Sequence, residues 1–140
     1  MIEAYQKQQY KKGRTAEMFF EAYCNKHAYQ WMKSYQNTHF KTGSYPYPFN
    51  RFLNLVKKEK WEPATYSGFP DYFVYFNDIE QGFFVEVKCN NAKLSSENKE
   101  LFAELAKCYP VFIFDMKIDF EQKQIISYDL KEFSCLIAEQ

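Results

Sequence analysis

Two neighbouring stretches of the sequence decide the fold: Asp71-Tyr72-Phe73-Val74-Tyr75-Phe76 and Phe83-Phe84-Val85-Glu86-Val87-Lys88. Both are dense in β-branched and aromatic residues, which favour β-strands. The six residues that join them, 77–82, are mostly polar, so we predict a β-hairpin. Glu86 and Lys88 interrupt an otherwise apolar strand, and charged residues rarely do so in a buried strand. The hairpin is therefore where we look first for chemistry.

The spacing of the charged residues places them on one face of this hairpin. Side chains alternate along a strand, so Glu86 and Lys88 share a face. If Phe76 pairs with Phe83, Asp71 lies across from Lys88 and diagonal to Glu86, about 7–8 Å away at the backbone. Asp71 and Glu86 share a face in any register in which the residue numbers of paired residues add to an odd sum. A slip of one residue makes the sum even and puts them on opposite faces.

Two carboxylates and a lysine in this arrangement suit the hydrolysis of phosphodiester bonds. Mg²⁺ prefers oxygen ligands, keeps several waters and takes the rest from substrate phosphate. The ion lowers the pKa of a bound water, and Lys88 could position that water or stabilise developing negative charge. Glu17 is the candidate for a third acid, because it lies at the margin of the buried face of the first predicted helix. We therefore expect Asp71, Glu86, Lys88 and Glu17 to be catalytic.

The same residues resemble a known family. Gly68-Phe69-Pro70-Asp71, followed by Glu86-Val87-Lys88, resembles the PD-(D/E)xK nuclease superfamily. Gly13-Arg14-Thr15-Ala16-Glu17 resembles the helix-one motif of its Holliday-junction resolvases, whose glutamate joins the metal site. Leu94-Ser95-Ser96-Glu97-Asn98 is similar to the Leu-Ser-x-x-Gln motif of the VRR-Nuc branch, with Asn98 in place of the usual Gln.

The resemblance implies a fold, a cofactor and partners. The fold would have a restriction-endonuclease-like core, and the protein would be an endodeoxyribonuclease that uses Mg²⁺ or Mn²⁺. Its substrate would be DNA, with branched DNA implied by the resolvases, which also imply a homodimer. The metal site assigned from the motifs consists of Asp71, Glu86, Val87 and Glu17.

The charge distribution points to a nucleic-acid partner although the net charge is zero. Residues 1–60 carry eleven basic and four acidic residues, and residues 61–140 carry seven and fourteen. This asymmetry predicts a basic face opposite an acidic one. Basic residues supply phosphate contacts, and exposed aromatic residues can stack on unpaired bases. The candidate DNA-binding residues are Lys11, Lys12, Arg14, Lys93 and Asn98.

The remaining pattern predicts helices on both sides of the strand region. We expect a helix that follows residues 13–15 and runs to about Ser34, an irregular stretch over 36–50, and a short basic helix over 51–60. Ser95 should cap another helix, strands should follow at 111–114 and 124–128, and Asp129 should cap a last helix. The fold class is thus α/β (α+β), with a mixed sheet of about four to five strands flanked by helices in a single domain over residues 1–140.

Several classes of protein are disfavoured. No segment approaches the roughly 18 consecutive apolar residues of a membrane helix, and the N-terminus lacks the apolar run of a signal peptide. We therefore expect a soluble cytoplasmic protein with no membrane partner. The four cysteines contain no CxxC pair and are expected to be reduced thiols. Two other functions stay open: a nucleic-acid-binding module that has lost catalysis, and an interaction protein whose aromatic residues form a partner surface.

Overall fold

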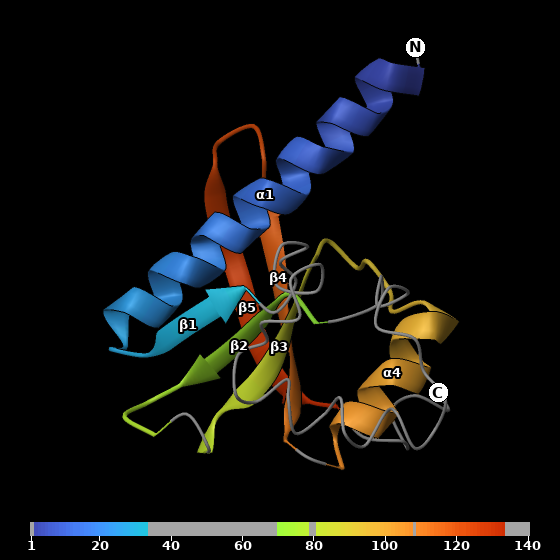
Figure 1. The fold of residues 1–140 in the computed structure, drawn as a ribbon. Helices are drawn as coiled ribbons and strands as arrows, with labels where there is room; N and C mark the ends of the chain where they lie inside the picture. The colour runs from blue at the N-terminus through green and yellow to red at the C-terminus, as the bar shows by residue number, and fades with distance from the viewer. Residues whose placement is uncertain (1, 34–69, 79–80, 108, 134–140) are drawn as a thin grey trace, which may run out of the picture.

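The fold is an α+β arrangement in which a five-stranded mixed sheet is flanked by two helices (Figure 1). The computed structural model describes residues 2–33, 70–78, 81–107 and 109–133. The elements in this part of the chain are α1 (Ile2–Lys26), β1 (Gln30–Lys33), β2 (Tyr72–Tyr75), β3 (Phe83–Cys89), α4 (Ser96–Leu105), β4 (Val111–Asp119) and β5 (Gln124–Glu132). The predicted fold class and strand number are confirmed.

The strands lie in the order of the sequence, which makes β3 the central strand. All neighbouring pairs are antiparallel except β3 and β4, which are parallel. A parallel pair needs a crossover connection, and α4 provides it. Because β3 has a neighbour on each side and a helix over each face, a charged residue on it is removed from water.

The two helices cover opposite faces of the sheet (Figure 1). Alternation along each strand divides the apolar residues between two clusters. The cluster under α1 contains Ala16, Phe20, Cys24, Tyr72, Val74, Val85, Phe114, Met116 and Ile118. The cluster under α4 contains Phe73, Phe84, Leu101, Phe102, Leu105, Tyr109, Val111 and Phe133. Glu86 follows Phe84 by two residues and so belongs to the α4 face of β3.

The first helix begins and ends earlier than predicted. It starts at Ile2, so Gly13 lies inside the helix, and it ends at Lys26. Ala28 adopts the left-handed conformation with φ of 60°, and the N–H of Tyr29 donates to the carbonyl of Cys24 at 2.9 Å. This hydrogen bond is typical of the C-terminal capping motif of helices, in which glycine usually occupies the left-handed position. The chain then enters β1 instead of continuing to Ser34 as a helix.

The predicted helix from Asp129 is wrong over the described residues, because β5 continues to Glu132. Leu130 packs against the cluster under α1, and Phe133 belongs to the cluster under α4. Two apolar residues three apart look helical in the sequence, but on a strand they point to opposite faces. Each of the two residues packs against a different cluster, so Leu130 is half-buried and Phe133, which directly follows β5, is buried.

The predicted hairpin is confirmed, but its register differs by two residues. Tyr72 pairs with Val85 and Phe73 with Phe84, so the paired numbers add to 157 and not to 159. The sum is still odd, which keeps Asp71 and Glu86 on one face. At the next position of the ladder Asp71 faces Glu86 directly, and not Lys88.

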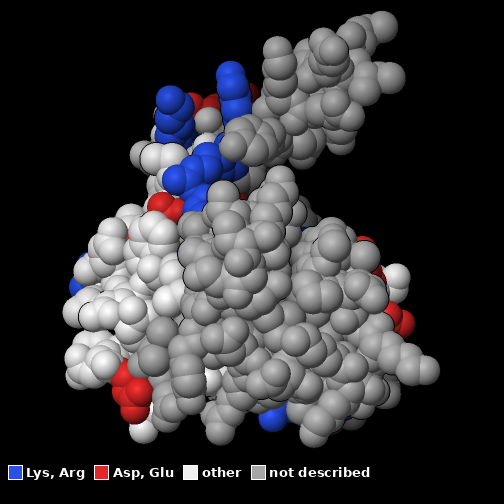
Figure 2. Space-filling model, viewed as in Figure 1, with Lys and Arg blue, Asp and Glu red and all other residues white. Residues whose placement is uncertain are grey.

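Other predictions fall partly outside the described residues. The stretch over 36–50 and the basic helix over 51–60 lie there entirely, as do Cys108 and Cys135. Cys24 is a buried free thiol and Cys89 a half-buried one, as predicted. No helix in the described part of the chain is long and apolar enough to span a membrane. On the face shown in Figure 2, Lys and Arg side chains gather at the upper end, where Figure 1 places α1 and the β4–β5 turn.

Candidate active site

The hairpin brings Asp71 and Glu86 together at the start of β2. The backbone N–H of Val87 donates to Oδ2 of Asp71 at 2.8 Å, which fixes that carboxylate against β3. Glu86 is only 5% exposed and is the one buried charged residue of the described chain. Asp71 also raises the pKa of Glu86, so the two carboxyl groups lie close enough to interact.

The surroundings of Glu86 favour its protonated form. Burial raises the pKa of Glu86 most, and the hydrogen bond and charge of Asp71 raise it further, to about 10. Lys88 opposes this shift, because its Nζ lies 3.8 Å from Oε2 of Glu86. One lysine does not compensate for burial and an adjacent carboxylate, so Glu86 keeps its proton. A cation that replaced this proton would be stabilised by both acids.

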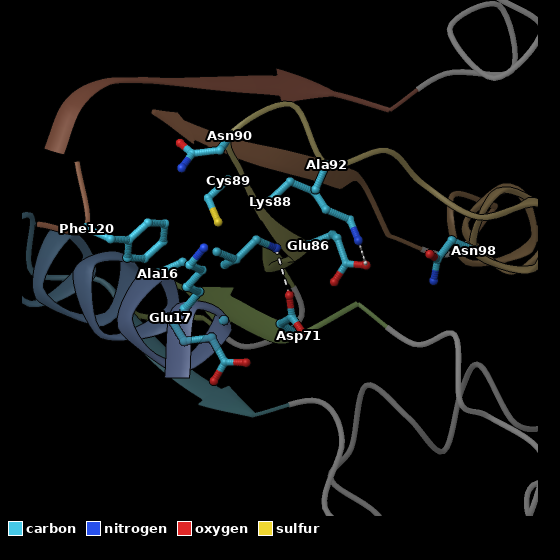
Figure 3. Close-up of a pocket in the computed structure, with 13 residues that line it drawn as sticks. Ala16, Glu17, Asp71, Glu86, Lys88, Cys89, Asn90, Ala92, Asn98 and Phe120 are labelled. Carbon is cyan, nitrogen blue, oxygen red and sulfur yellow. Dashed lines mark hydrogen bonds and ion pairs between the residues drawn. The ribbon is translucent and has the colours of Figure 1, made fainter. Parts of the chain in front are cut away.

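These residues line one pocket, whose volume is about 650 Å³ (Figure 3). Its walls come from α1, from the start of β2, from β3 and the turn after it, from α4 and from the end of β4. Among the described residues the lining comprises Lys12, Gly13, Ala16, Glu17, Asp71, Glu86, Val87, Lys88, Cys89, Asn90, Ala92, Asn98 and Phe120. Seven of the predicted site residues therefore lie in one pocket: Asp71, Glu86, Val87, Lys88, Glu17, Lys12 and Asn98.

The donor set fits a divalent ion of the Mg²⁺ type. Such an ion commonly uses one or two protein carboxylates and completes its shell with water and substrate phosphate. Asp71 and Glu86 provide two carboxylates beside an open pocket. The described part of the chain holds no group of three or more His, Cys, Asp or Glu residues that could bind a metal. Among the described residues, the donors are two carboxylates, which leave positions on such an ion open for water and substrate phosphate.

Glu17 lines the same pocket but is paired with cations in this structure. Its Oε2 accepts from Nη1 of Arg14 at 3.1 Å and from Nζ of Lys33 at 3.3 Å. Figure 3 shows its carboxylate directed away from those of Asp71 and Glu86. The structure therefore places Glu17 next to the predicted site without gathering it into the carboxylate pair.

Arg14 belongs to a polar network beneath α1, outside the pocket. It donates to Oε2 of Glu21 at 2.9 Å, and the hydroxyl of Tyr72 donates to the same oxygen. The hydrogen bond to Glu21 raises the pKa of the guanidinium. Burial, followed by the hydrogen bond to Glu21, raises the pKa of the Tyr72 phenol. Arg14, predicted to bind DNA, is thus held by two glutamates.

The remaining predicted DNA-binding residues are divided. Lys12 lines the pocket, whereas Lys11 and Lys93 are exposed and lie outside it. Asn98 lines the pocket and also forms the capping box of α4 with Ser95. Its backbone N–H donates to Oγ of Ser95 at 3.0 Å, and its Oδ1 accepts from the backbone N–H of Ser95 at 3.2 Å. This confirms Ser95 as the cap and gives Asn98 a structural role.

Sequence reasoning missed the far end of the pocket. Asn90 directly follows β3 and adopts the left-handed conformation. Its side chain joins the end of β3 to β4: Oδ1 accepts from the N–H of Ile118 at 2.8 Å, and Nδ2 donates to the carbonyl of Ile118 at 3.1 Å. The Asn90-Asn91 pair was a usable signal, because asparagine favours left-handed turns. Phe120 gave no signal, because only the tertiary fold brings it to α1.

Comparisons of the chain with protein-family models, curated proteins and solved structures gave no match. The resemblance to PD-(D/E)xK nucleases therefore rests on the motif residues alone and stays a prediction.

Proposed function

We propose that this protein is a Mg²⁺- or Mn²⁺-dependent endodeoxyribonuclease that hydrolyses phosphodiester bonds. One observation carries the proposal: a buried glutamate next to an aspartate, with a lysine ammonium 3.8 Å away, on the wall of an open pocket. Burying two adjacent carboxylates costs stability unless a proton or a cation compensates them. A divalent ion would supply the missing positive charge, and it would in turn bind a phosphate of the substrate.

Each residue has a role that follows from its position. Asp71 and Glu86 would hold the ion, and the N–H of Val87 keeps the Asp71 carboxylate in place. A bound divalent ion would lower the pKa of a coordinated water and offset charge on the phosphate. Lys88 donates hydrogen bonds from its ammonium, either to the attacking water or to a phosphate oxygen. Lys12 supplies a second positive charge within the same pocket.

The finer substrate assignment rests on the motifs. The likeness of residues 13–17 to the resolvase motif supports branched DNA as substrate and a homodimer as the active form. Glu17 is retained as a proposed fourth member of the site. To join it, the Glu17 carboxylate would have to leave its ion pairs with Arg14 and Lys33.

The test is cleavage of plasmid, linear and four-way-junction DNA in Mg²⁺, Mn²⁺ or EDTA. We expect cleavage that needs a divalent ion, is undetectable for Asp71→Asn and Glu86→Gln, and falls about 100-fold or more for Lys88→Met. The chain offers a matched control, because Asp129 and Lys131 also form an acid–lysine pair two residues apart, at 3.7 Å, but both are exposed. Asp129→Asn and Lys131→Met should retain wild-type cleavage.

The outcomes separate the proposal from its rival. Cleavage that survives in Asp71→Asn would show that the site lies elsewhere. Binding of DNA without cleavage in any metal would instead favour a catalytically inactive nucleic-acid-binding module. The intact acid–acid–lysine set is the observation against that alternative.

A further inference from the structure

One end of the pocket is formed by an aromatic ring with a lysine over it. Nζ of Lys12, on α1, lies 5.5 Å from the centroid of the Phe120 ring, which directly follows β4. Both residues are half-exposed, and both line the pocket that holds Asp71 and Glu86. Figure 3 shows Phe120 at one end of this pocket and Asn98 at the other, with the two carboxylates between them.

The wall between Phe120 and the carboxylates is kept open by small residues of α1. Ala16 is buried and presents only a methyl group. Gly13 also lines the pocket, and a Cβ added there would meet no atom within 4 Å. Glycine in a helix interior costs about 1 kcal/mol relative to alanine. Neither packing nor backbone conformation requires glycine at position 13. The effect of the missing side chain is to leave this part of the pocket open.

The chemistry at this end suits one part of a nucleic acid in particular. An aromatic face binds a base by stacking, and a lysine binds the attached phosphate. A base inside a duplex has both faces covered by its neighbours, so a ring on a protein wall reaches only an unstacked base. A pocket of about 650 Å³ is of the size that holds a ligand no larger than a nucleotide or two.

We propose that Phe120 and Lys12 form a subsite for one unpaired nucleotide next to the scissile phosphate, with its base stacked on Phe120 and its phosphate on Lys12. This deepens the proposed nuclease function and rests on it for the position of the cut. It assigns the substrate class: DNA with an unpaired stretch, such as a single strand, a flap or the open centre of a branch. On binding, Lys12 moves from the ring face to the phosphate.

The test measures binding in EDTA, so that it does not depend on cleavage. The probes are a single-stranded oligonucleotide carrying 2-aminopurine, whose fluorescence is quenched by stacking on an aromatic ring, and the same sequence as a duplex. We expect quenching and tighter binding for the single strand. Phe120→Ala should abolish the quenching and weaken single-strand binding about tenfold, with little effect on the duplex. Phe120→Trp should restore both.

Two further variants make the result specific. Phe76→Ala is the matched control, because Phe76 is 55% exposed and lies outside the pocket; it should behave like the wild type. Gly13→Leu should fill the open volume and weaken single-strand binding without lowering stability, since leucine favours helix more than glycine does.

The results also distinguish this inference from the proposed function. Equal binding of single strand and duplex, or quenching that survives in Phe120→Ala, would overturn the subsite. If quenching depends on Phe120 but no metal supports cleavage, the subsite stands and the nuclease assignment fails. If metal-dependent cleavage occurs and Phe120→Ala cleaves single strands as well as the wild type does, the nuclease stands and the subsite is refuted.

Discussion

At the scale of single residues, Glu86 makes the stability of the protein depend on pH. The folded chain keeps a proton on Glu86 up to a pKa of about 10, whereas the unfolded chain releases it near the ordinary value of 4.5. The unfolded state therefore binds fewer protons at neutral pH, so the stabilisation present below about pH 4.5 is lost as pH rises toward 10. One group contributes at most about 1.4 kcal/mol per pH unit.

We accordingly expect the melting temperature in EDTA to fall between pH 5 and pH 8.5, and Mn²⁺ to raise it most at the alkaline end. The ion takes the place of the proton and binds only the folded state. Glu86→Gln should remove most of the slope and the effect of Mn²⁺. The measurement stops at pH 8.5 because burial raises the pKa of Cys24 to about 12. Above about pH 9 this thiol makes the melting temperature depend on pH for a second reason. A wild-type slope that persists in Glu86→Gln would contradict this account.

How far the sequence predicted the site can be judged from two acid–lysine pairs. Glu86-Val87-Lys88 and Asp129-Leu130-Lys131 have the same spacing, and both form ion pairs near 4 Å. Only the first could be recognised as special, because apolar residues surround it and Asp71 lies across the hairpin. The exact register could not be predicted: Asn77 adopts a φ of 64° and Asp78 donates to the carbonyl of Phe76, so β2 ends one residue early.

At the scale of elements, the hairpin that aligns Asp71 with Glu86 depends on Gly82. A Cβ there would lie 2.4 Å from Cζ of Phe73 and 2.7 Å from the carbonyl oxygen of Val74. The second contact is with backbone, which cannot move without disturbing β2. We expect Gly82→Ala to lower the free energy of unfolding by about 1–3 kcal/mol and to weaken cleavage through misplacement of Asp71.

Gly13→Ala provides the comparison, because its added methyl meets no atom and lies in a helix interior. It should raise the free energy of unfolding by about 1 kcal/mol. Urea titration of both variants measures the two effects on one scale. If Gly82→Ala were as stable as the wild type, the close packing of Phe73 over the turn would be refuted.

The sequence predicted which central helices and strands form better than it predicted where they end. The strands 72–75 and 83–89 and the cap of α4 at Ser95 follow from local propensity, which tertiary contacts reinforce. The end of α1 could not be predicted, because Ala28 holds a left-handed position at which glycine is the usual signal. The length of β5 was missed because the spacing of Leu130 and Phe133 suits a helix as well as an extended chain whose two residues pack against different clusters.

At the scale of the whole molecule, the basic residues before Ala16 should differ in what they contribute to DNA binding. Lys11 and Lys12 have exposed or half-exposed ammonium groups, whereas Arg14 is shared between Glu17 and Glu21. We expect the double variant Lys11→Ala/Lys12→Ala to reduce the slope of log affinity against log salt by about 1–2. Arg14→Ala should change that slope little.

Arg14→Ala should instead lower the melting temperature, because Glu21, which also accepts from the buried hydroxyl of Tyr72, loses its cationic partner. Fluorescence anisotropy across a salt series and thermal melts of the same preparations measure both quantities. A salt slope that falls as much in Arg14→Ala as in the double variant would show that its guanidinium leaves the glutamates to bind phosphate.

The way α1 rests on the sheet has a consequence for local unfolding. Its buried residues are Ala16, Phe20 and Cys24, while its N-terminal half extends beyond the sheet (Figure 1). Lys12 and Gly13 lie at the boundary between these halves, and they form a wall of the pocket. A helix that frays from its N-terminal end would reach this wall before it reaches the buried residues. A molecule bound in the pocket should therefore slow the local unfolding of this half of α1. Amide hydrogen exchange along α1 would then report on binding at the carboxylates of Asp71 and Glu86.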